Sequence, residues 1–182
     1  MNNLPRFIRW PFIFLAICWG VWFFEAVTHI DLGVWGILPR HWSGLWGILF
    51  SPFLHGGLWH LVANTVPVAV LMFLILFFYP RLAPAALLFI HIGTGLCVWL
   101  AARPSYHIGA SGVIYGYASF LFFSGIFRKS WRAALLSLLV FLLYGGMVAG
   151  VFPTDPHISW EAHLLGAFTG GVGAYIFREE PA

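Results

Sequence analysis

Two side chains that could act as a nucleophile and its general base lie far apart in this sequence. Ser111 stands in the run Gly109-Ala110-Ser111-Gly112, and His163 follows much later in the chain. A serine hydroxyl is a poor nucleophile until a neighbouring base takes its proton. Glu161 is offset from His163 by two positions, which turns it about 160–200° around a helix. The spacing therefore predicts a Ser111–His163 dyad without a carboxylate partner.

Further groups could stabilise the negative charge that develops on a substrate carbonyl oxygen. Ser111 is predicted to begin a helix among glycines, where free backbone N–H groups and the positive end of the helix point toward an anion. His60 and Asn64 are four residues apart, so they share one helix face and could add donors. We therefore expect an oxyanion hole formed by His60, Asn64 and the Ser111 backbone N–H.

These residues lie in a chain that is too apolar to be soluble in water. Of the 182 residues, 61% are hydrophobic and 8% are charged, whereas a soluble domain averages about 45–50% and 25%. The composition predicts one membrane domain over residues 1–182. Nine Lys and Arg against six Asp and Glu are too few and too scattered for nucleic-acid binding. Cys18 and Cys97 fall in apolar runs, so we expect buried free thiols.

Six segments are apolar and long enough to cross a bilayer, for which a helix needs about 20 residues. We expect spans over residues 11–27, 58–79, 84–101, 111–127, 133–151 and 159–177. The first segment lacks a small-x-small cleavage site, so we interpret it as a retained anchor. The loop over residues 28–57 follows the first span, so it is expected to lie on the external side of the membrane. We expect it in the interface between lipid and water, because it carries tryptophans among glycines.

The basic residues predict the orientation of the chain. With six spans, seven Arg and Lys side chains fall on the side of the termini and two fall on the other side. The positive-inside rule then places both termini in the cytoplasm, and we expect a multi-pass protein of the plasma (inner) membrane. The seven are Arg6, Arg9, Arg81, Arg128, Lys129, Arg132 and Arg178, and the two are Arg40 and Arg103.

Depth in the membrane supports the proposed dyad. Counting about 1.5 Å per helical residue from the cytoplasmic charges places Ser111, His163 and Asn64 about 22–25 Å above the inner surface. Polar side chains on three spans are therefore expected at one level, and such residues are functional candidates because burial in lipid is costly. His91, in the third span, has no motif partner and is expected to be a packing histidine.

This constellation resembles the rhomboid intramembrane serine proteases. The resemblance covers about residues 10–178 and implies an all-α, minimal six-helix bundle with a long first loop. Three pieces match, in order, on spans two, four and six. They are His55-x4-His60-x3-Asn64, Gly109-Ala110-Ser111-Gly112 with Tyr115, and Ala162-His163-x-x-Gly166 with Gly170.

The resemblance implies an endopeptidase that cleaves single-span or multi-span membrane proteins in the lipid bilayer, near the outer end of their helices. It implies Ser111 as the nucleophile and His163 as the general base, with no metal and no cofactor. Tyr115 would pack on His163, and His55 would support the first loop. The glycines of the motifs would flank the nucleophile or let spans four and six approach closely. These are Gly109, Gly112, Gly166 and Gly170.

One position departs from the family pattern. Members often carry Trp-Arg nine and eight residues before the first His of the motif, and this chain has Trp46-Gly47. Arg40 or His41 could substitute for that arginine in anchoring the first loop. The segment 153–157, between spans five and six, is a candidate cap above the site.

Two other functions remain open at this stage. A catalytically silent rhomboid-like protein would bind membrane helices without cutting them, and the missing arginine keeps this alternative in view. A metal site or small transporter would use the eight histidines. Zinc catalysis commonly needs a carboxylate or a third nearby ligand, and transporters usually show internal repeats. We find no convincing repeat here.

Overall fold

The computed structural model describes residues 9–155 and 158–179. Within these ranges the secondary structure is helical, apart from an isolated β-bridge between Ile37 and His107. Arg6 and the last two residues of the expected cap, Pro156 and His157, lie outside the described residues. The chain is an all-α membrane bundle, as predicted. Its long helices are α1 (Trp10–Thr28), α3 (Leu58–Phe78), α4 (Ala83–Ala101), α5 (Ser111–Phe127), α6 (Trp131–Tyr144) and α7 (Trp160–Ile176).

Five of the six predicted segments coincide with a helix to within about one residue at each end. The exception is 133–151, where α6 begins at Trp131 and ends at Tyr144, and the chain continues as the 3-10 helix η5 (Gly145–Val151). Glycine weakens an α-helix, and Gly145, Gly146 and Gly150 fall in this stretch. By length and composition, α1, α3, α4 and the combined α6–η5 segment could each cross a membrane, and α5 is a shorter apolar helix.

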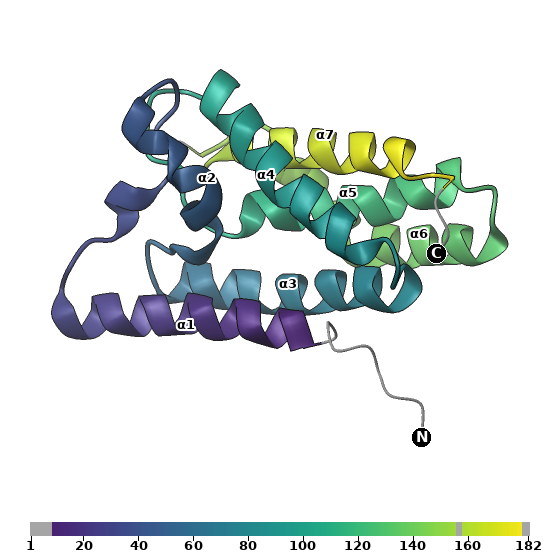
Figure 1. The fold of residues 1–182 in the computed structure, drawn as a ribbon, viewed down its shortest axis with the longest axis horizontal. Helices are drawn as coiled ribbons and strands as arrows, with labels where there is room; N and C mark the ends of the chain where they lie inside the picture. Colours follow the sequence, from purple (N-terminus) through teal and green to yellow (C-terminus); the bar gives the residue numbers. More distant parts are fainter. Residues whose placement is uncertain (1–8, 156–157, 180–182) are drawn as a thin grey trace.

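Helix α5 lies at the centre of the bundle. It packs against α7 most extensively, and also against α6, α3 and α4. Figure 1 shows α1 and α3 side by side along one edge, with α4 and α7 on the other side of the molecule. Large apolar side chains with almost no exposed surface fill the space between the helices, which fixes their relative positions. They include Leu71, Ile75, Ile90, Tyr117 and Phe120.

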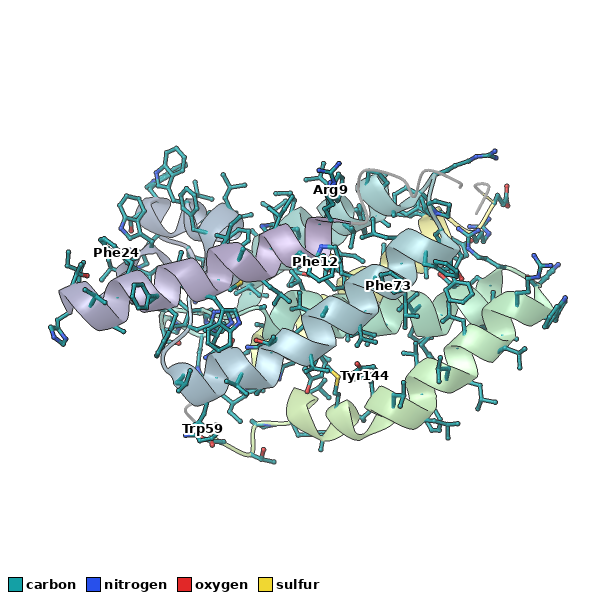
Figure 2. The ribbon with its side chains drawn as sticks, turned by 90° about the horizontal axis from the view of Figure 1, so that it is seen from below. Arg9, Phe12, Phe24, Trp59, Phe73 and Tyr144 are labelled. Carbon is teal, nitrogen blue, oxygen red and sulfur yellow. The ribbon has the colours of Figure 1, made fainter. Side chains whose placement is uncertain are left out.

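The outside of the bundle is covered with exposed apolar side chains. Phe12 on α1 is 71% exposed, and Phe24 and Phe73 also lie on the surface, where Figure 2 labels them. A water-soluble protein rarely exposes a continuous apolar surface of this extent. The surface therefore suits lipid. Of the two cysteines, Cys18 is buried as predicted and Cys97 is only partly buried, and both are free thiols.

Helices α5 and α7 approach each other along a glycine seam, formed by Gly112 and Gly116 on α5 and Gly166 and Gly170 on α7. A Cβ atom added at Gly166 would overlap the carbonyl oxygen of Gly112, and one added at Gly170 would overlap that of Gly116. The two backbones are thus in direct contact, which small residues alone permit. The close approach predicted for these two helices is present.

The first loop, residues 29–57, folds into short helical turns that pack on α4 and on the chain before α5. They are η2 (Gly33–Trp35), η3 (Trp42–Leu45), α2 (Gly47–Phe50) and η4 (Ser51–Phe53). A Cβ at Gly47 would overlap the backbone of Gly36 and Ile37, so the arginine often found here in the family does not fit this loop. Arg40 anchors the loop instead. Its guanidinium donates to the Leu100 and Ala102 carbonyl oxygens at 3.2 and 2.9 Å.

Of the two residues proposed to replace the missing arginine, Arg40 is therefore the one whose side chain makes the contact. The guanidinium reaches carbonyl oxygens at the C-terminal end of α4, which lack partners within the helix and attract a cation. His41 takes part through its backbone, because its carbonyl oxygen accepts a hydrogen bond from Trp99 Nε1 at 2.9 Å.

Candidate active site

The structure brings Ser111 and His163 together at the ends of the two helices that the glycine seam joins. Ser111 is the first residue of α5, and His163 lies in the first turn of α7. The distance between Ser111 Oγ and His163 Nε2 is 2.8 Å. His163 is 8% exposed. The juxtaposition expected from the sequence is thus reproduced at hydrogen-bonding distance.

A backbone carbonyl selects the tautomer of His163. Nδ1 lies 2.8 Å from the carbonyl oxygen of Gly150, in η5. A carbonyl oxygen can only accept a hydrogen bond, so Nδ1 carries the proton of the neutral imidazole. The lone pair is then on Nε2 and faces the Ser111 hydroxyl. This is the arrangement that a buried carboxylate enforces in a Ser-His-Asp triad.

Tyr115 fixes the plane of the His163 ring. The two rings are stacked with centroids 4.2 Å apart and an interplanar angle of 7°. The Tyr115 hydroxyl donates to the Met147 carbonyl oxygen at 2.7 Å, so both rings are held by the backbone of η5. A side chain at Gly150 would overlap the Tyr115 hydroxyl. The absence of a side chain there lets the tyrosine and the histidine reach this segment together.

Glu161 does not contact His163. Its Oε1 atom lies 3.5 Å from Nε of Arg103, in the loop before α5, and the carboxylate is buried. A buried carboxylate needs a partner, and Arg103 supplies it. The predicted separation of Glu161 from the dyad is therefore observed, and the carboxylate has a structural partner of its own.

A cavity of about 630 Å³ opens beside the dyad. Polar side chains from α3, from the loop over residues 102–110, from the start of α5 and from the region around the start of α7 line it. They include His60, Arg103, His107, Ser111, Ser159 and His163. Burial lowers the pKa of His107, while its contact with the Arg103 carbonyl oxygen opposes this shift. The cavity is large enough for an extended peptide segment and for water.

The proposed oxyanion donors occupy different positions around this cavity. His60 lies in its wall. Asn64 is buried one turn further along α3, and its Nδ2 donates to the His60 carbonyl oxygen at 3.0 Å. His55 is buried beside His60, with ring centroids 5.0 Å apart and an interplanar angle of 65°. Its Nδ1 lies 3.3 Å from the Phe53 carbonyl oxygen, so His55 connects the first loop to the His60 ring.

Gly109 lets the chain before Ser111 pass close to His60. Its φ of +107° is a backbone conformation that favours glycine. A Cβ at this position would also lie 2.6 Å from the His60 ring. Its amide donates to the Ser51 carbonyl oxygen at 2.9 Å, which ties this turn to the first loop. Gly112, on the far side of Ser111, belongs to the glycine seam.

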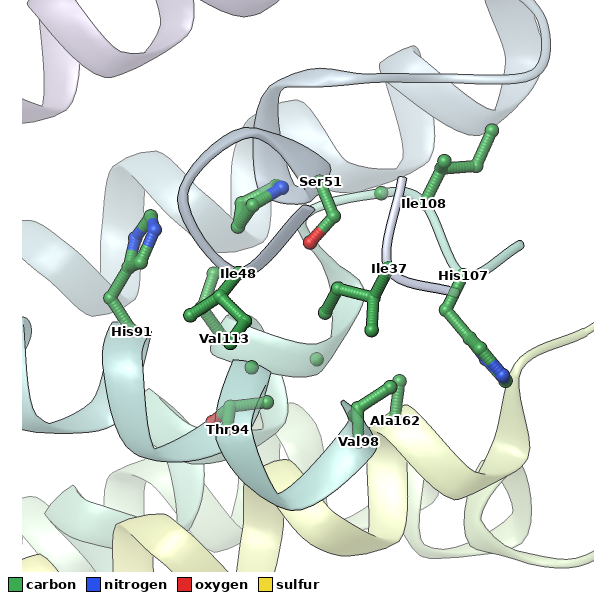
Figure 3. A pocket seen from close by; sticks show the side chains of 14 residues that line it. Ile37, Ile48, Ser51, His91, Thr94, Val98, His107, Ile108, Val113 and Ala162 are labelled. Carbon is green, nitrogen blue, oxygen red and sulfur yellow. The ribbon is translucent and has the colours of Figure 1, made fainter. Parts of the chain in front are cut away.

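A second, small cavity of about 20 Å³ lies between the first loop, α4 and the start of α5. Figure 3 shows the side chains of Ile37, Ile48, Val98 and Val113 converging on it, so this region is well packed. His91 lies at its edge, and Nε2 is 3.2 Å from the Leu49 carbonyl oxygen. This environment fits the packing histidine that we expected.

Several groups of the site were not predicted from the sequence. The carbonyl oxygens of Gly150 and Met147 leave no trace in side-chain patterns, because every residue has one. His107 and Ser159 are visible in the sequence as polar residues four positions before Ser111 and His163. Because His107 lies in the loop before α5 and not on a helix, the spacing alone does not show that the two side chains meet.

Comparison with known proteins agrees with the fold. The family model of the Rhomboid domain matches residues 43–180. An uncharacterized protein of Mycobacterium tuberculosis H37Rv is 38% identical over 173 residues, which cover 90% of this chain and 72% of the relative. An uncharacterized protein of Mycobacterium leprae is 36% identical over 173 residues, covering 90% and 68%. The chain therefore belongs to the rhomboid family.

Proposed function

We propose that this protein is an intramembrane serine endopeptidase that cleaves the transmembrane helices of membrane-protein substrates near their outer end. The observation that carries the proposal is the hydrogen bond between Ser111 Oγ and His163 Nε2, with Nδ1 held by the Gly150 carbonyl oxygen. The geometry meets the requirement that the base lies within about 2.6–3.2 Å of the oxygen atom whose proton it removes. A helix-binding protein without catalysis has no need of this tautomer.

The first chemical step is acylation of Ser111. His163 Nε2 takes the hydroxyl proton as Oγ bonds to the carbonyl carbon of the scissile peptide, which gives a tetrahedral oxyanion. The oxyanion accepts hydrogen bonds from the Ser111 backbone N–H, which is at the start of α5 and has no partner within the helix, and from His60. The imidazolium then donates its proton to the leaving amine as the C–N bond breaks.

Deacylation uses the same groups in reverse. A water molecule from the cavity attacks the acyl carbon, and His163 takes the proton of that water. The tetrahedral intermediate collapses, the bond to Oγ breaks, and the serine hydroxyl regains its proton from the imidazolium. Asn64 was also expected as an oxyanion donor, but its Nδ2 donates to the His60 carbonyl oxygen one turn away, so we assign it a supporting role beside His60. Tyr115 keeps the imidazole plane fixed as its charge changes.

The substrate must present an extended peptide to Ser111, so its helix must unwind locally. Gly, Pro and small side chains near the cut weaken a helix and favour this step. With both termini in the cytoplasm, the site lies toward the outer face, and Ile158, just before α7, lines the cavity. These features favour substrates that are already unstable as helices at that level of the membrane.

The deciding experiment compares wild type and Ser111→Ala on a purified single-span reporter in liposomes, with fluorophosphonate labelling of the same samples. Wild type is expected to cut and to take the label at Ser111, and the variant is expected to do neither. Ser119→Ala is the matched control, because this serine is also on α5 and its hydroxyl donates to the Ala167 carbonyl oxygen at 2.6 Å. Cleavage by Ser111→Ala, or a wild type that neither cuts nor labels, would contradict the proposal.

A further inference from the structure

A second serine–histidine contact lies four residues before the dyad on each of the two chain segments. His107 Nδ1 contacts Ser159 Oγ. His107 lies four residues before Ser111, and Ser159 lies four residues before His163. The two contacts therefore join the same two chain segments at successive levels, with the serine and the histidine exchanged between the segments. Figure 3 shows the His107 side chain directed toward the chain that leads into α7.

The proton positions of this second contact follow from its other partner. His107 Nε2 lies 3.0 Å from the Arg103 carbonyl oxygen. Because that oxygen only accepts, Nε2 carries the proton, and Nδ1 accepts the hydroxyl proton of Ser159. His107 is 3% exposed and Ser159 is partly buried, at the edge of the cavity. The contact is thus a directed, partly buried bond between the loop before α5 and the start of α7.

The Ser159 hydroxyl donates a hydrogen bond to His107 and does not cap its own helix. It is the N-cap residue of α7, and serine at that position commonly accepts a hydrogen bond from a backbone N–H of the first turn. Its side chain makes no such cap bond. The helix therefore forgoes a local cap, while the hydroxyl makes a bond to a distant segment.

Arg103 adds a second connection between the same two segments. Its Nη2 donates to the Ile158 carbonyl oxygen at 2.8 Å, and its Nε lies 3.5 Å from Glu161 Oε1. The residues on both sides of Ser159 are thereby tied to the loop before α5. That loop is itself fixed, because His107 exchanges two backbone hydrogen bonds with Ile37, at 2.9 and 3.0 Å.

We propose that His107 and Ser159 form a positioning pair that holds Ser111 and His163 at hydrogen-bonding distance, an inference that rests on the proposed protease function. On one side of the dyad, the glycine seam sets the distance between α5 and α7. On the other side, the His107–Ser159 bond sets it. The dyad lies between the glycine seam and the His107–Ser159 bond. While both contacts are intact, Ser111 and His163 cannot move apart.

The test measures kcat, KM and the rate of fluorophosphonate labelling of Ser111 in the full chain in liposomes. Ser159→Ala is expected to lower kcat and the labelling rate about tenfold, with KM unchanged, since a displacement of 1 Å can cost about 100-fold in rate. Ser159→Thr retains the hydroxyl and is expected to restore both rates. Ser137→Ala is the matched control, because this buried hydroxyl donates to the Phe122 carbonyl oxygen, away from the cavity.

A double-variant cycle separates a shared bond from two independent effects. His107→Leu combined with Ser159→Ala is expected to be about as slow as either single variant, because both remove one interaction. Multiplicative effects would overturn the pair. A lower melting temperature with unchanged kcat would also overturn it, because the contact would then be purely structural.

Two further results have distinct meanings. Fluorophosphonate labelling of Ser159 in the Ser111→Ala variant would overturn the positioning role, because the exchanged pair would itself be reactive. A wild type that neither cuts nor labels would overturn this proposal together with the proposed function. Equal rates in wild type and Ser159→Ala, with wild type active, would overturn the positioning pair alone.

Discussion

Two regions hold the dyad in different ways: the glycine seam, and the segments around the site. We call these segments, η5 and the first loop, the rim. In the seam, the backbones of α5 and α7 touch at Gly112–Gly166 and Gly116–Gly170. In the rim, the Gly150 carbonyl oxygen of η5 contacts His163, and the Met147 carbonyl oxygen accepts a hydrogen bond from Tyr115, which stacks on His163. The seam therefore fixes where Ser111 and His163 are, and the rim fixes how the imidazole is turned.

The same contrast is visible in the burial of the helices. None of the seven residues of η5 is buried, whereas eight of the 17 residues of α5 and seven of the 17 residues of α7 are buried. A segment with few buried contacts opens at lower free energy than one in the core. The site thus combines a tightly packed pair of helices with a partner segment, η5, that is held by far fewer contacts.

The largest effect is expected from breaking the seam. Gly166→Ala places a methyl group on the Gly112 carbonyl oxygen, and because that atom belongs to the backbone, the helices must separate. We expect activity to fall at least about 100-fold, since misplacement by about 1 Å is enough for this. We also expect a loss of about 1–3 kcal/mol in the free energy of unfolding, as in an overpacked core. Reporter cleavage and thermal unfolding in detergent measure the two quantities.

Gly171→Ala is the control for this prediction, because it adds the same atom to the same helix on another face. A Cβ there would meet the Phe123 ring at 3.4 Å, an ordinary contact. We expect this variant to be close to wild type in both assays. Equal losses in the two variants would mean that the helix tolerates no added methyl anywhere, and the special role of the seam would be refuted.

The sequence predicted the seam side of this comparison well. Gly112, Gly166 and Gly170 were identified from the motifs, and the predicted helices begin and end close to the observed ones. The reason is physical: apolar length sets the spans, and an added atom at a helix contact has a direct steric effect. Such effects depend on residue type and spacing, which a sequence displays.

The rim was harder to predict, because its contacts use the backbone. The residue types at positions 150 and 147 do not indicate that the carbonyl oxygens of Gly150 and Met147 contact His163 and Tyr115. The end of α6 at Tyr144 was missed for a related reason, since the following stretch is apolar enough to continue a span. For the first loop, Arg40 and His41 were equally plausible anchors, and only the path of the loop over α4 separates them.

The second prediction concerns the pH dependence of stability, and it tests the first-loop part of the rim through His55. Burial, together with the neighbouring His60, lowers the pKa of His55 from 6.5 to about 4, against the hydrogen bond to Phe53, which raises it. In the unfolded chain the His55 imidazole binds a proton as the pH falls below about 6.5, its ordinary pKa. In the folded chain it binds this proton only near pH 4. The free energy of unfolding should therefore fall as the pH drops through this window, by about 2 kcal/mol at pH 5.

The measurement is the melting temperature of wild type and His55→Gln between pH 7.5 and 4.5. The difference in pH dependence between the two proteins isolates His55, because the other histidines are common to both. We expect the curve of His55→Gln to be flatter. Parallel curves would show that His55 takes up its proton equally in the folded and unfolded chains, and this prediction would fail.

The third prediction weakens the link between the seam and η5. Tyr115→Phe retains the ring that stacks on His163 but loses the hydroxyl that donates to Met147. A single neutral hydrogen bond contributes about 0.5–1.5 kcal/mol, so we expect kcat to fall about two- to tenfold. Tyr115→Leu removes the stack as well and should be slower. A Phe variant as slow as the Leu variant would mean that the hydroxyl, and not the stacked ring, orients the imidazole.

The smallest effect on catalysis is expected far out on the rim. Arg40→Ala removes two hydrogen bonds to the end of α4, at an exposed position away from the dyad. Because solvent competes for these bonds, we expect a loss of about 1 kcal/mol in the free energy of unfolding and little change in kcat. Arg40→Lys retains the charge but cannot reach both carbonyl oxygens with the same geometry, so it should restore only part of the stability. If Arg40→Ala instead lowered kcat as strongly as Tyr115→Phe, the first loop would be coupled to the dyad as closely as η5 is. The effect of rim substitutions on kcat would then not decrease with distance from the dyad.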